Sequence, residues 1–251
     1  MTGIDHIALT VRDLPGMAEF YETALGLVAM GGDGGTRRLG TGGQVLVELR
    51  GDRQARPRDP RDAGLFHTAF LLPGRADLGR WLRHAAGAGI RLTGASDHGV
   101  SEALYLDDPE GNGIEIYRDR DPADWTRDGD RIEMFTRRLD LNDLAASGTS
   151  AWRGIPEGSV VGHVHLQVGE LPQADRFFRE GLGLAQTFGG PGGAWYGWDG
   201  YHHHLAGNVW NSRGAGPRPD GHAGLAEVVI RGHSHAGATL GDPWGTRFRL
   251  V

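Results

Sequence analysis

The chain repeats its own sequence, and an internal repeat restricts a chain to folds in which similar units pack against one another. Residues 3–27 read GIDHIALTVRDLPGMAEFYETALGL, and residues 160–184 read VVGHVHLQVGELPQADRFFREGLGL in constant register. In both copies alternating apolar residues predict a strand, and apolar residues at helical spacing after a proline predict an amphipathic helix. Each copy ends in Leu-Gly-Leu, where the glycine suits a helix C-cap. The repeat therefore predicts a strand–helix unit that occurs at least twice.

A second, weaker pair of repeats lies between and after these copies. Residues 64–72 (GLFHTAFLL) predict a strand, residues near 77–82 predict a helix, and residues 108–117 (DPEGNGIEIY) predict a turn that enters a strand. Residues 224–230 (GLAEVVI) and 242–251 (DPWGTRFRLV) repeat the two ends of this unit without the helix between them. The sequence thus predicts an α+β fold of four βαβββ-type units, of which the fourth is truncated.

These repeats divide the chain into three parts. Residues 1–118 hold units one and two in tandem, residues 119–159 form a charged connector, and residues 160–251 hold unit three and the shortened unit four. The connector is expected on the surface, with a short helix near residues 139–144. The repeats alone leave open whether unit two pairs in space with unit one or with unit three.

Composition excludes several classes of function. The 251 residues include no cysteine and no lysine, so disulfides, thiolate metal sites and cysteine nucleophiles are excluded. A net charge of −6 without a basic stripe argues against a nucleic-acid partner. No apolar window is long enough for a membrane helix, and the glycine-rich stretches match no nucleotide-binding fingerprint. We therefore expect a soluble, cytoplasmic protein without a nucleotide cofactor.

The repeated units resemble the vicinal oxygen chelate superfamily, which includes glyoxalase I, bleomycin-resistance proteins and type I extradiol dioxygenases. The resemblance lies in the first-strand histidines His6, His67 and His163, in helices of the FYxxxLG type, and in the closing segment from Asp108 to Glu115. Within the superfamily, residues 98–106 and 201–206 are similar to the two-domain, catechol 2,3-dioxygenase-like branch. The resemblance implies that the units pair into two cupped, barrel-like mixed sheets, and that one cup holds a divalent metal.

Two metal-ligand sets are compatible with this resemblance. If units two and three pair, the set is His67, Glu115 and His163; if units one and two pair, His6 replaces His163 and Glu48 becomes a possible fourth ligand, as in glyoxalase I. Two histidines and one carboxylate with open positions are typical of non-haem iron oxygenases, so Fe(II) is the expected metal, with Mn(II) as an alternative.

The resemblance also implies catalytic residues. It assigns the acid–base role to His203, which it places on the last strand of unit three, and it assigns hydrogen-bond donors for bound oxygen to Tyr105, ten residues before Glu115, and to His98. These residues would share one cup only if units two and three pair, so we favour that pairing. Unit four carries Arg249 at the position of Glu115, and because arginine cannot ligate a cation, a single metal site is expected.

The expected function is therefore Fe(II)-dependent extradiol (meta) cleavage of a catechol-type aromatic diol by O₂. One alternative is a glyoxalase- or isomerase-like metalloenzyme that uses the His6, Glu48, His67 and Glu115 set. Another is a non-catalytic protein that binds an aromatic compound, as bleomycin-resistance proteins do. The expected partners are the diol and O₂, with no nucleic acid and no membrane. A homo-oligomer is a further hypothesis, because the truncated unit four leaves apolar surface on unit one that a second subunit could cover.

Overall fold

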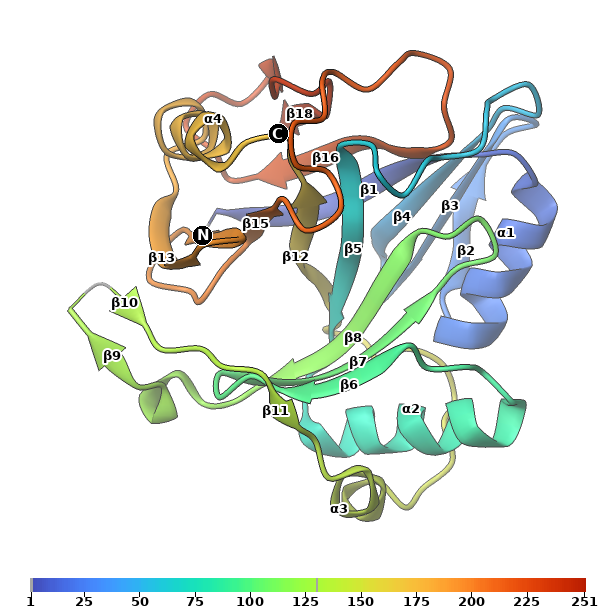
Figure 1. The fold of residues 1–251 in the computed structure, drawn as a ribbon. Coiled ribbons are helices and arrows are strands. Elements are labelled where there is room, and N and C mark those ends of the chain that lie inside the picture. The colour runs from blue at the N-terminus through green and yellow to red at the C-terminus, as the bar shows by residue number, and fades with distance from the viewer. Residues whose placement is uncertain (1, 130) are drawn as a thin grey trace.

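The computed structural model describes residues 2–129 and 131–251, and it confirms the α+β fold (Figure 1). Strands form a seven-stranded sheet in the order β17-β18-β16-β1-β4-β3-β2 and a nine-stranded sheet in the order β11-β6-β7-β8-β5-β12-β15-β14-β13. The first sheet comprises β1 (Gly3–Val11), β2 (Val28–Gly32), β3 (Thr36–Thr41), β4 (Gln44–Gly51), β16 (Gly224–Arg231), β17 (Thr239–Gly241) and β18 (Arg247–Leu250). The second comprises β5 (Gly64–Leu71), β6 (Gly94–Asp97), β7 (Ser101–Asp107), β8 (Gly113–Asp119), β11 (Arg137–Arg138), β12 (Val160–Gln167), β13 (Ala185–Gly190), β14 (Gly193–Gly197) and β15 (Leu205–Asn208).

Within the described residues, four α-helices pack against these two sheets. They are α1 (Leu14–Phe20), α2 (Arg75–Ala88), α3 (Leu141–Ser147) and α4 (Leu171–Arg176), with a 3₁₀ turn at Pro122–Asp124. The repeated helices α1 and α4 each continue into a π-helical turn, at Tyr21–Leu25 and Phe177–Gly181. Helix α3 and the small hairpin of β9 (Arg127–Asp128) and β10 (Arg131–Ile132) belong to the connector. No helix within residues 2–129 and 131–251 combines the length and apolar character that crossing a membrane requires.

Each sheet combines two units, units one and four in the seven-stranded sheet and units two and three in the nine-stranded sheet. Strand β1 of unit one pairs antiparallel with β16 of unit four, and β5 of unit two pairs antiparallel with β12 of unit three. Within a unit the first strand lies parallel to the last, as β5 does to β8. The order β8-β5-β12 therefore places three strands with candidate ligands side by side.

The two sheets share one apolar core, and α2 contributes to it through one face. Leu78, Trp81, Leu82 and Ala85 are buried at helical spacing, which is the pattern of an amphipathic helix. The Trp81 indole is fully buried and its Nε1 donates to the Ala24 carbonyl at 2.9 Å, so the helix of unit two is held against the helix of unit one.

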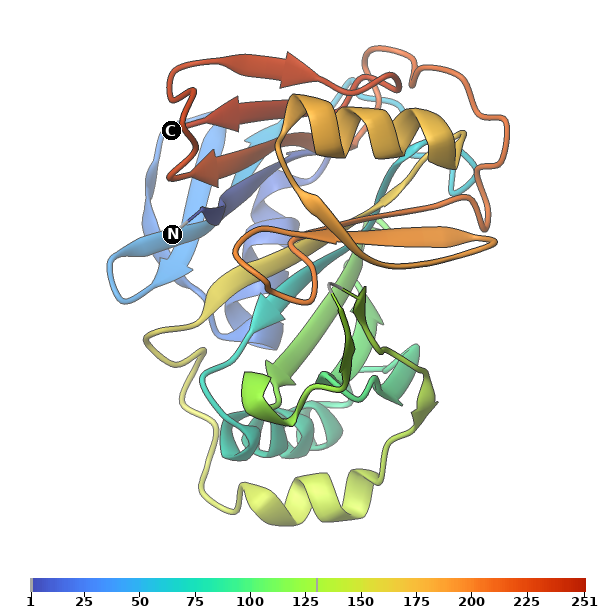
Figure 2. The same ribbon diagram turned by 90° about the vertical axis from the view of Figure 1, so that its left-hand side faces the viewer.

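Helix α4 compensates for the helix that unit four lacks. Phe178, in the π-helical turn after α4, packs against Tyr196 of β14 with ring centroids 5.1 Å apart. The preceding Phe177 packs against Phe248 of β18 at 5.3 Å, and Phe248 is fully buried. Figure 2 shows α4 lying between the strands of unit four and the β13–β14 hairpin. One helix thus covers apolar surface of two units.

The Asp-Pro turns before β8 and β18 are each held together by their aspartate. Asp108 Oδ1 accepts hydrogen bonds from the backbone amides of Glu110 and Asn112, both at 2.9 Å, and its Oδ2 accepts from Asn112 Nδ2 at 2.8 Å. Burial raises the pKa of Asp108 to about 6. In unit four Asp242 makes the equivalent bonds to Trp244 and Thr246. The turn at Asp108 starts β8, which carries Glu115.

Candidate metal and catalytic site

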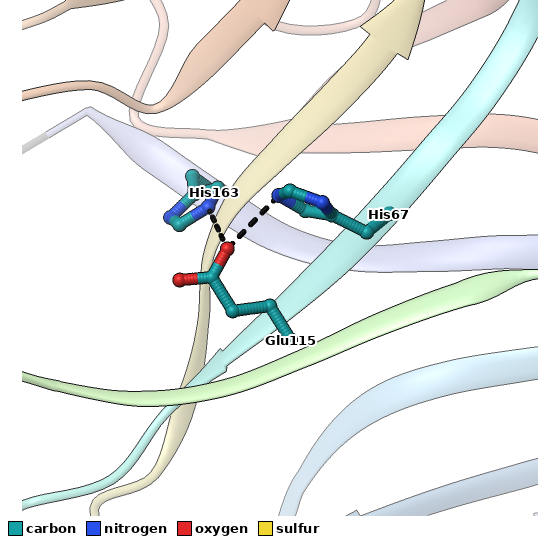
Figure 3. Close-up of side chains that lie close together, drawn as sticks. All are labelled: His67, Glu115 and His163. Atoms are coloured by element: carbon teal, nitrogen blue, oxygen red, sulfur yellow. Dashed lines mark hydrogen bonds and ion pairs between the residues drawn. The ribbon is translucent and has the colours of Figure 1, made fainter. Parts of the chain in front are cut away.

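Three buried side chains converge from neighbouring strands of the nine-stranded sheet. His67 lies on β5, Glu115 on β8 and His163 on β12, and one ligand atom from each lies within 4.8 Å of the others. Glu115 Oε2 is 2.9 Å from His67 Nε2 and 3.1 Å from His163 Nε2 (Figure 3). We refer to these three residues as the triad.

The electrostatics of the triad favour the protonation states that bind a cation. Burial by itself would raise the pKa of the Glu115 carboxyl, but the attraction and hydrogen bond of His163, together with the adjacent His67 imidazole, outweigh it and hold that pKa well below its usual value. Burial lowers the pKa of His163, against the opposing effect of Glu115. An ionised carboxylate beside a neutral imidazole is the form in which these groups ligate metals.

One unpaired atom in the triad indicates room for a ligand. His67 Nε2 is buried and, among the described residues, makes no hydrogen bond of acceptable geometry despite its short distance to Glu115. A buried polar atom left without a partner is costly unless an ion or water satisfies it. The donor set of two imidazoles and one carboxylate fits Fe(II) or Mn(II).

The alternative ligands lie elsewhere. His6 is on β1 in the other sheet, where its Nδ1 is 2.6 Å from Asp5 Oδ2. Glu48 accepts hydrogen bonds from Arg38 Nε at 2.9 Å and from Arg50 Nε at 2.8 Å. The structure therefore does not bring His6 or Glu48 to His67. The equivalent positions in unit four, Glu227 and Arg249, pair with each other at 2.9 Å.

His203 lies beside the triad at the end of a chain of hydrogen bonds. Its ring centroid is 4.1 Å from that of His163, and its Nδ1 is 2.7 Å from His202 Nδ1. His202 Nε2 in turn is 2.8 Å from Asp119 Oδ1. Because a carboxylate only accepts, a neutral His202 donates through Nε2 to Asp119 and accepts through Nδ1 from His203. This assignment leaves the lone pair on His203 Nε2.

The sequence analysis placed His203 on the last strand of unit three, but the segment around His203 is not a strand. Residues 201–204 form a bend, and β15 begins only at Leu205. A strand would have turned His202 and His203 to opposite faces, whereas the bend lets their Nδ1 atoms meet. Burial, followed by the neighbouring histidines, lowers the pKa of His203, so its imidazole is neutral.

Tyr105 and His98 form a second pair at the same cavity. Tyr105 lies on β7 and His98 directly after β6, and their Oη and Nε2 atoms are 2.8 Å apart. His98 Nδ1 is 2.8 Å from the Phe135 carbonyl, which can only accept, so the Tyr105 hydroxyl donates to His98 Nε2. Burial, and next Glu115, raise the pKa of Tyr105 well above its usual value. Tyr105 is therefore a protonated phenol.

These residues line one open cavity of about 610 Å³. Its polar end holds the triad, His203, Tyr105 and His98. Most of the connector is exposed, and three of its residues, Met134, Phe135 and Thr136, also line the cavity, because β11 pairs with β6 and brings the connector to it. The remaining lining includes the aromatic residues Phe66, Phe188, Trp195 and Trp210 together with small, aliphatic and polar residues.

Sequence reasoning missed the partners of the site histidines. Asp119 and His202 were not singled out, and His165 was not assigned a role. Asn208 Oδ1 accepts from the Trp210 amide at 3.1 Å, so its Nδ2 donates to His165 Nε2 at 3.0 Å and the proton of His165 lies on Nδ1. No residue spacing signals these contacts, because each joins separate loops or strands.

Comparisons with known proteins agree with this architecture. Residues 3–116 match the Glyoxalase/Bleomycin resistance protein/Dioxygenase superfamily. A catechol-2,3-dioxygenase of Bacillus subtilis (strain 168) is 36% identical over 235 residues, which cover 91% of this chain and 82% of that protein. A biphenyl-2,3-diol 1,2-dioxygenase of Rhodococcus globerulus is 32% identical over 117 residues, 45% of this chain and 62% of that protein.

Solved structures share the fold at low sequence identity. A glyoxalase I variant from Zea mays superposes with a TM-score of 0.61 at 16% identity, covering 100% of this chain and 93% of that chain. A dioxygenase-like protein from Bacillus subtilis gives a TM-score of 0.58 at 17% identity, covering 91% of this chain and 69% of that chain. At such identities the superpositions establish the fold alone.

Proposed function

Because the chain belongs to the Glyoxalase/Bleomycin resistance protein/Dioxygenase superfamily, we propose that it is a non-haem, Fe(II)-dependent extradiol dioxygenase. Its substrates would be a catechol-type aromatic diol and O₂, and it would open the ring beside the diol. The similarity to a catechol-2,3-dioxygenase over most of the chain supports this reaction class. The observation that carries the proposal is the convergence of the triad, His203 and the Tyr105–His98 pair on one cavity.

In this proposal His67, Glu115 and His163 hold the metal. Three protein ligands leave open positions, so a bound Fe(II) or Mn(II) would supply Lewis-acid chemistry for the diol and O₂. The protein contributes a rigid frame, since the three ligands stand on hydrogen-bonded neighbouring strands. It also contributes one negative charge, from Glu115.

His203 is the proposed general base. Its Nε2 carries the lone pair and its side chain lines the cavity, so it can take a proton from a catechol hydroxyl and return it after ring opening. Asp119 and His202 act as positioning residues, because their hydrogen bonds select the tautomer of His203. In this proposal the Tyr105 hydroxyl turns from His98 Nε2 to donate a hydrogen bond to an oxygen atom that binds at the triad, and His98 holds Tyr105 in place as a positioning residue.

The test is reconstitution of the protein with Fe(II) under anaerobic conditions, metal analysis, and then addition of catechol and O₂. Formation of the yellow semialdehyde with uptake of one O₂ per catechol is the expected result. His203→Gln should retain the metal and lose most of the turnover. Protein that takes up iron but binds catechol without cleaving it would leave only a binding function, and protein that takes up no iron would refute the proposal.

A further inference from the structure

One wall of the cavity beyond the triad is aromatic. Phe66 and Trp210 pack with ring centroids 5.2 Å apart, and His165 lies 5.3 Å from Trp210 and 5.9 Å from Trp195. This set, which we call the aromatic wall (Phe66, His165, Trp195 and Trp210), begins at the triad, because Phe66 and His67 are adjacent in the chain with ring centroids 5.3 Å apart. Trp210 is 52% exposed and marks its outer end.

The cavity is larger than a single ring requires. A cavity of about 150 Å³ accommodates benzene, whereas this cavity measures about 610 Å³. A catechol held at the triad therefore leaves space along the aromatic wall for a substituent. Aromatic side chains bind apolar and aromatic groups through burial and ring stacking.

The cavity also lacks a permanent cation. Arginine provides all 26 permanently charged basic side chains of the protein, yet no arginine is found among the described residues that line the cavity. Two carboxylates, Asp107 and Glu115, do line it. Two exposed arginines lie nearby without lining it: Arg131 stacks on Phe188 at 4.9 Å and Arg137 on Phe135 at 4.1 Å. An anionic substituent would thus lose its hydration and gain no ion-pair partner inside the cavity.

We propose that the cavity selects an uncharged catechol with an apolar substituent that lies on the aromatic wall, and that it rejects catechols with a carboxylate. This inference rests on the proposed function and adds the substrate class. Phe66, Trp195 and Trp210 are the residues that determine it. Trp210 has the clearest role, because it lies at the outer end of the wall and is exposed.

Ligand binding to the Fe(II)-loaded protein tests whether the cavity rejects catechols with a carboxylate. Anaerobic calorimetric titration measures Kd for 3,4-dihydroxybenzoate and for its methyl ester, a pair of similar size that differs in charge, and the 2,3-isomers test the other ring position. We expect the acid of each pair to bind at least ten-fold more weakly than the ester. Equal or tighter binding of the acid would overturn the inference, as would an Arg131→Ala or Arg137→Ala variant that loses affinity for the acid alone.

A variant tests the aromatic wall. Trp210→Ala should weaken binding of 4-tert-butylcatechol at least five-fold while catechol itself changes less than two-fold. Leu141→Ala is the matched control, since Leu141 is an exposed apolar residue on α3, away from the cavity lining. Equal effects of Trp210→Ala on both ligands would refute the role of the wall. If no catechol binds at all, the proposed function fails together with this inference; if all bind and the acid equals its ester, only the inference fails.

Discussion

The assignment of the metal ligands makes a quantitative prediction about thermal stability. A ligand that binds only the folded state adds about 2.7 kcal/mol at a concentration 100 times its Kd. For a chain of about this size, each 1 kcal/mol shifts Tm by roughly 2–4 °C. Saturating Mn(II), which can be handled in air, should therefore raise Tm by roughly 5–11 °C. Anaerobic Fe(II) should act in the same way.

Variants of the triad should abolish this shift. Glu115→Gln keeps the shape of the buried side chain and removes its charge, so the metal-free protein should still fold while the metal-induced shift disappears. His163→Ala should also lose the shift. His6→Ala is the matched control, because His6 occupies the equivalent position of unit one but lies in the other sheet. We expect it to retain the full shift.

Differential scanning fluorimetry with and without metal measures these shifts. Comparing each variant with its own metal-free form separates lost metal binding from a general loss of stability. The reasoning is refuted if His6→Ala loses the shift while His163→Ala keeps it, since units one and two would then supply the ligands. A full shift in Glu115→Gln would also refute it, because the metal would then bind outside the triad.

Three further predictions follow from particular contacts. His203→Gln should lower kcat for ring cleavage by roughly 10²–10⁴-fold, and Asp119→Asn should lower kcat less. The metal-induced Tm shift should be unchanged in both variants. An unchanged kcat in His203→Gln would refute the assignment of His203 as the base. Burial lowers the pKa of His204 to about 3, against about 6.5 in the unfolded chain. Between these two values the unfolded state binds a proton that the folded state does not. The free energy of unfolding therefore falls as the pH falls from 6.5 toward 3. His204→Gln should reduce that slope by up to about 1.4 kcal/mol per pH unit, measured by urea unfolding between pH 4 and 6.5, and an identical slope would contradict the prediction. Trp81→Ala should lower the free energy of unfolding by about 3–5 kcal/mol, because Trp81 is fully buried. Trp81→Phe should lower it less. A loss below about 1 kcal/mol in Trp81→Ala would show that the contact between α2 and unit one contributes little.

The sequence by itself determined the repeating unit and its chemistry. The spacing of apolar residues predicts the first strands and helices of units one to three, because amphipathic periodicity is a local property. The Asp108 turn and Glu115 are likewise recognisable from contiguous residues, since the turn is held by bonds within five residues. The absence of cysteine leaves histidine and carboxylate as the available ligands.

Only the tertiary structure decided which units meet. His6 and His163 occupy the same position in two copies of one repeat, so no local pattern distinguishes them. Pairing of β5 with β12 brings His163 to Glu115, and pairing of β1 with β16 takes His6 away. The same holds for the bond between His202 and Asp119, which are 83 residues apart, and for the connector at the cavity. Strand pairing between distant segments depends on how the apolar faces of the sheets and helices pack together. The periodicity within one segment does not indicate which other segment it pairs with.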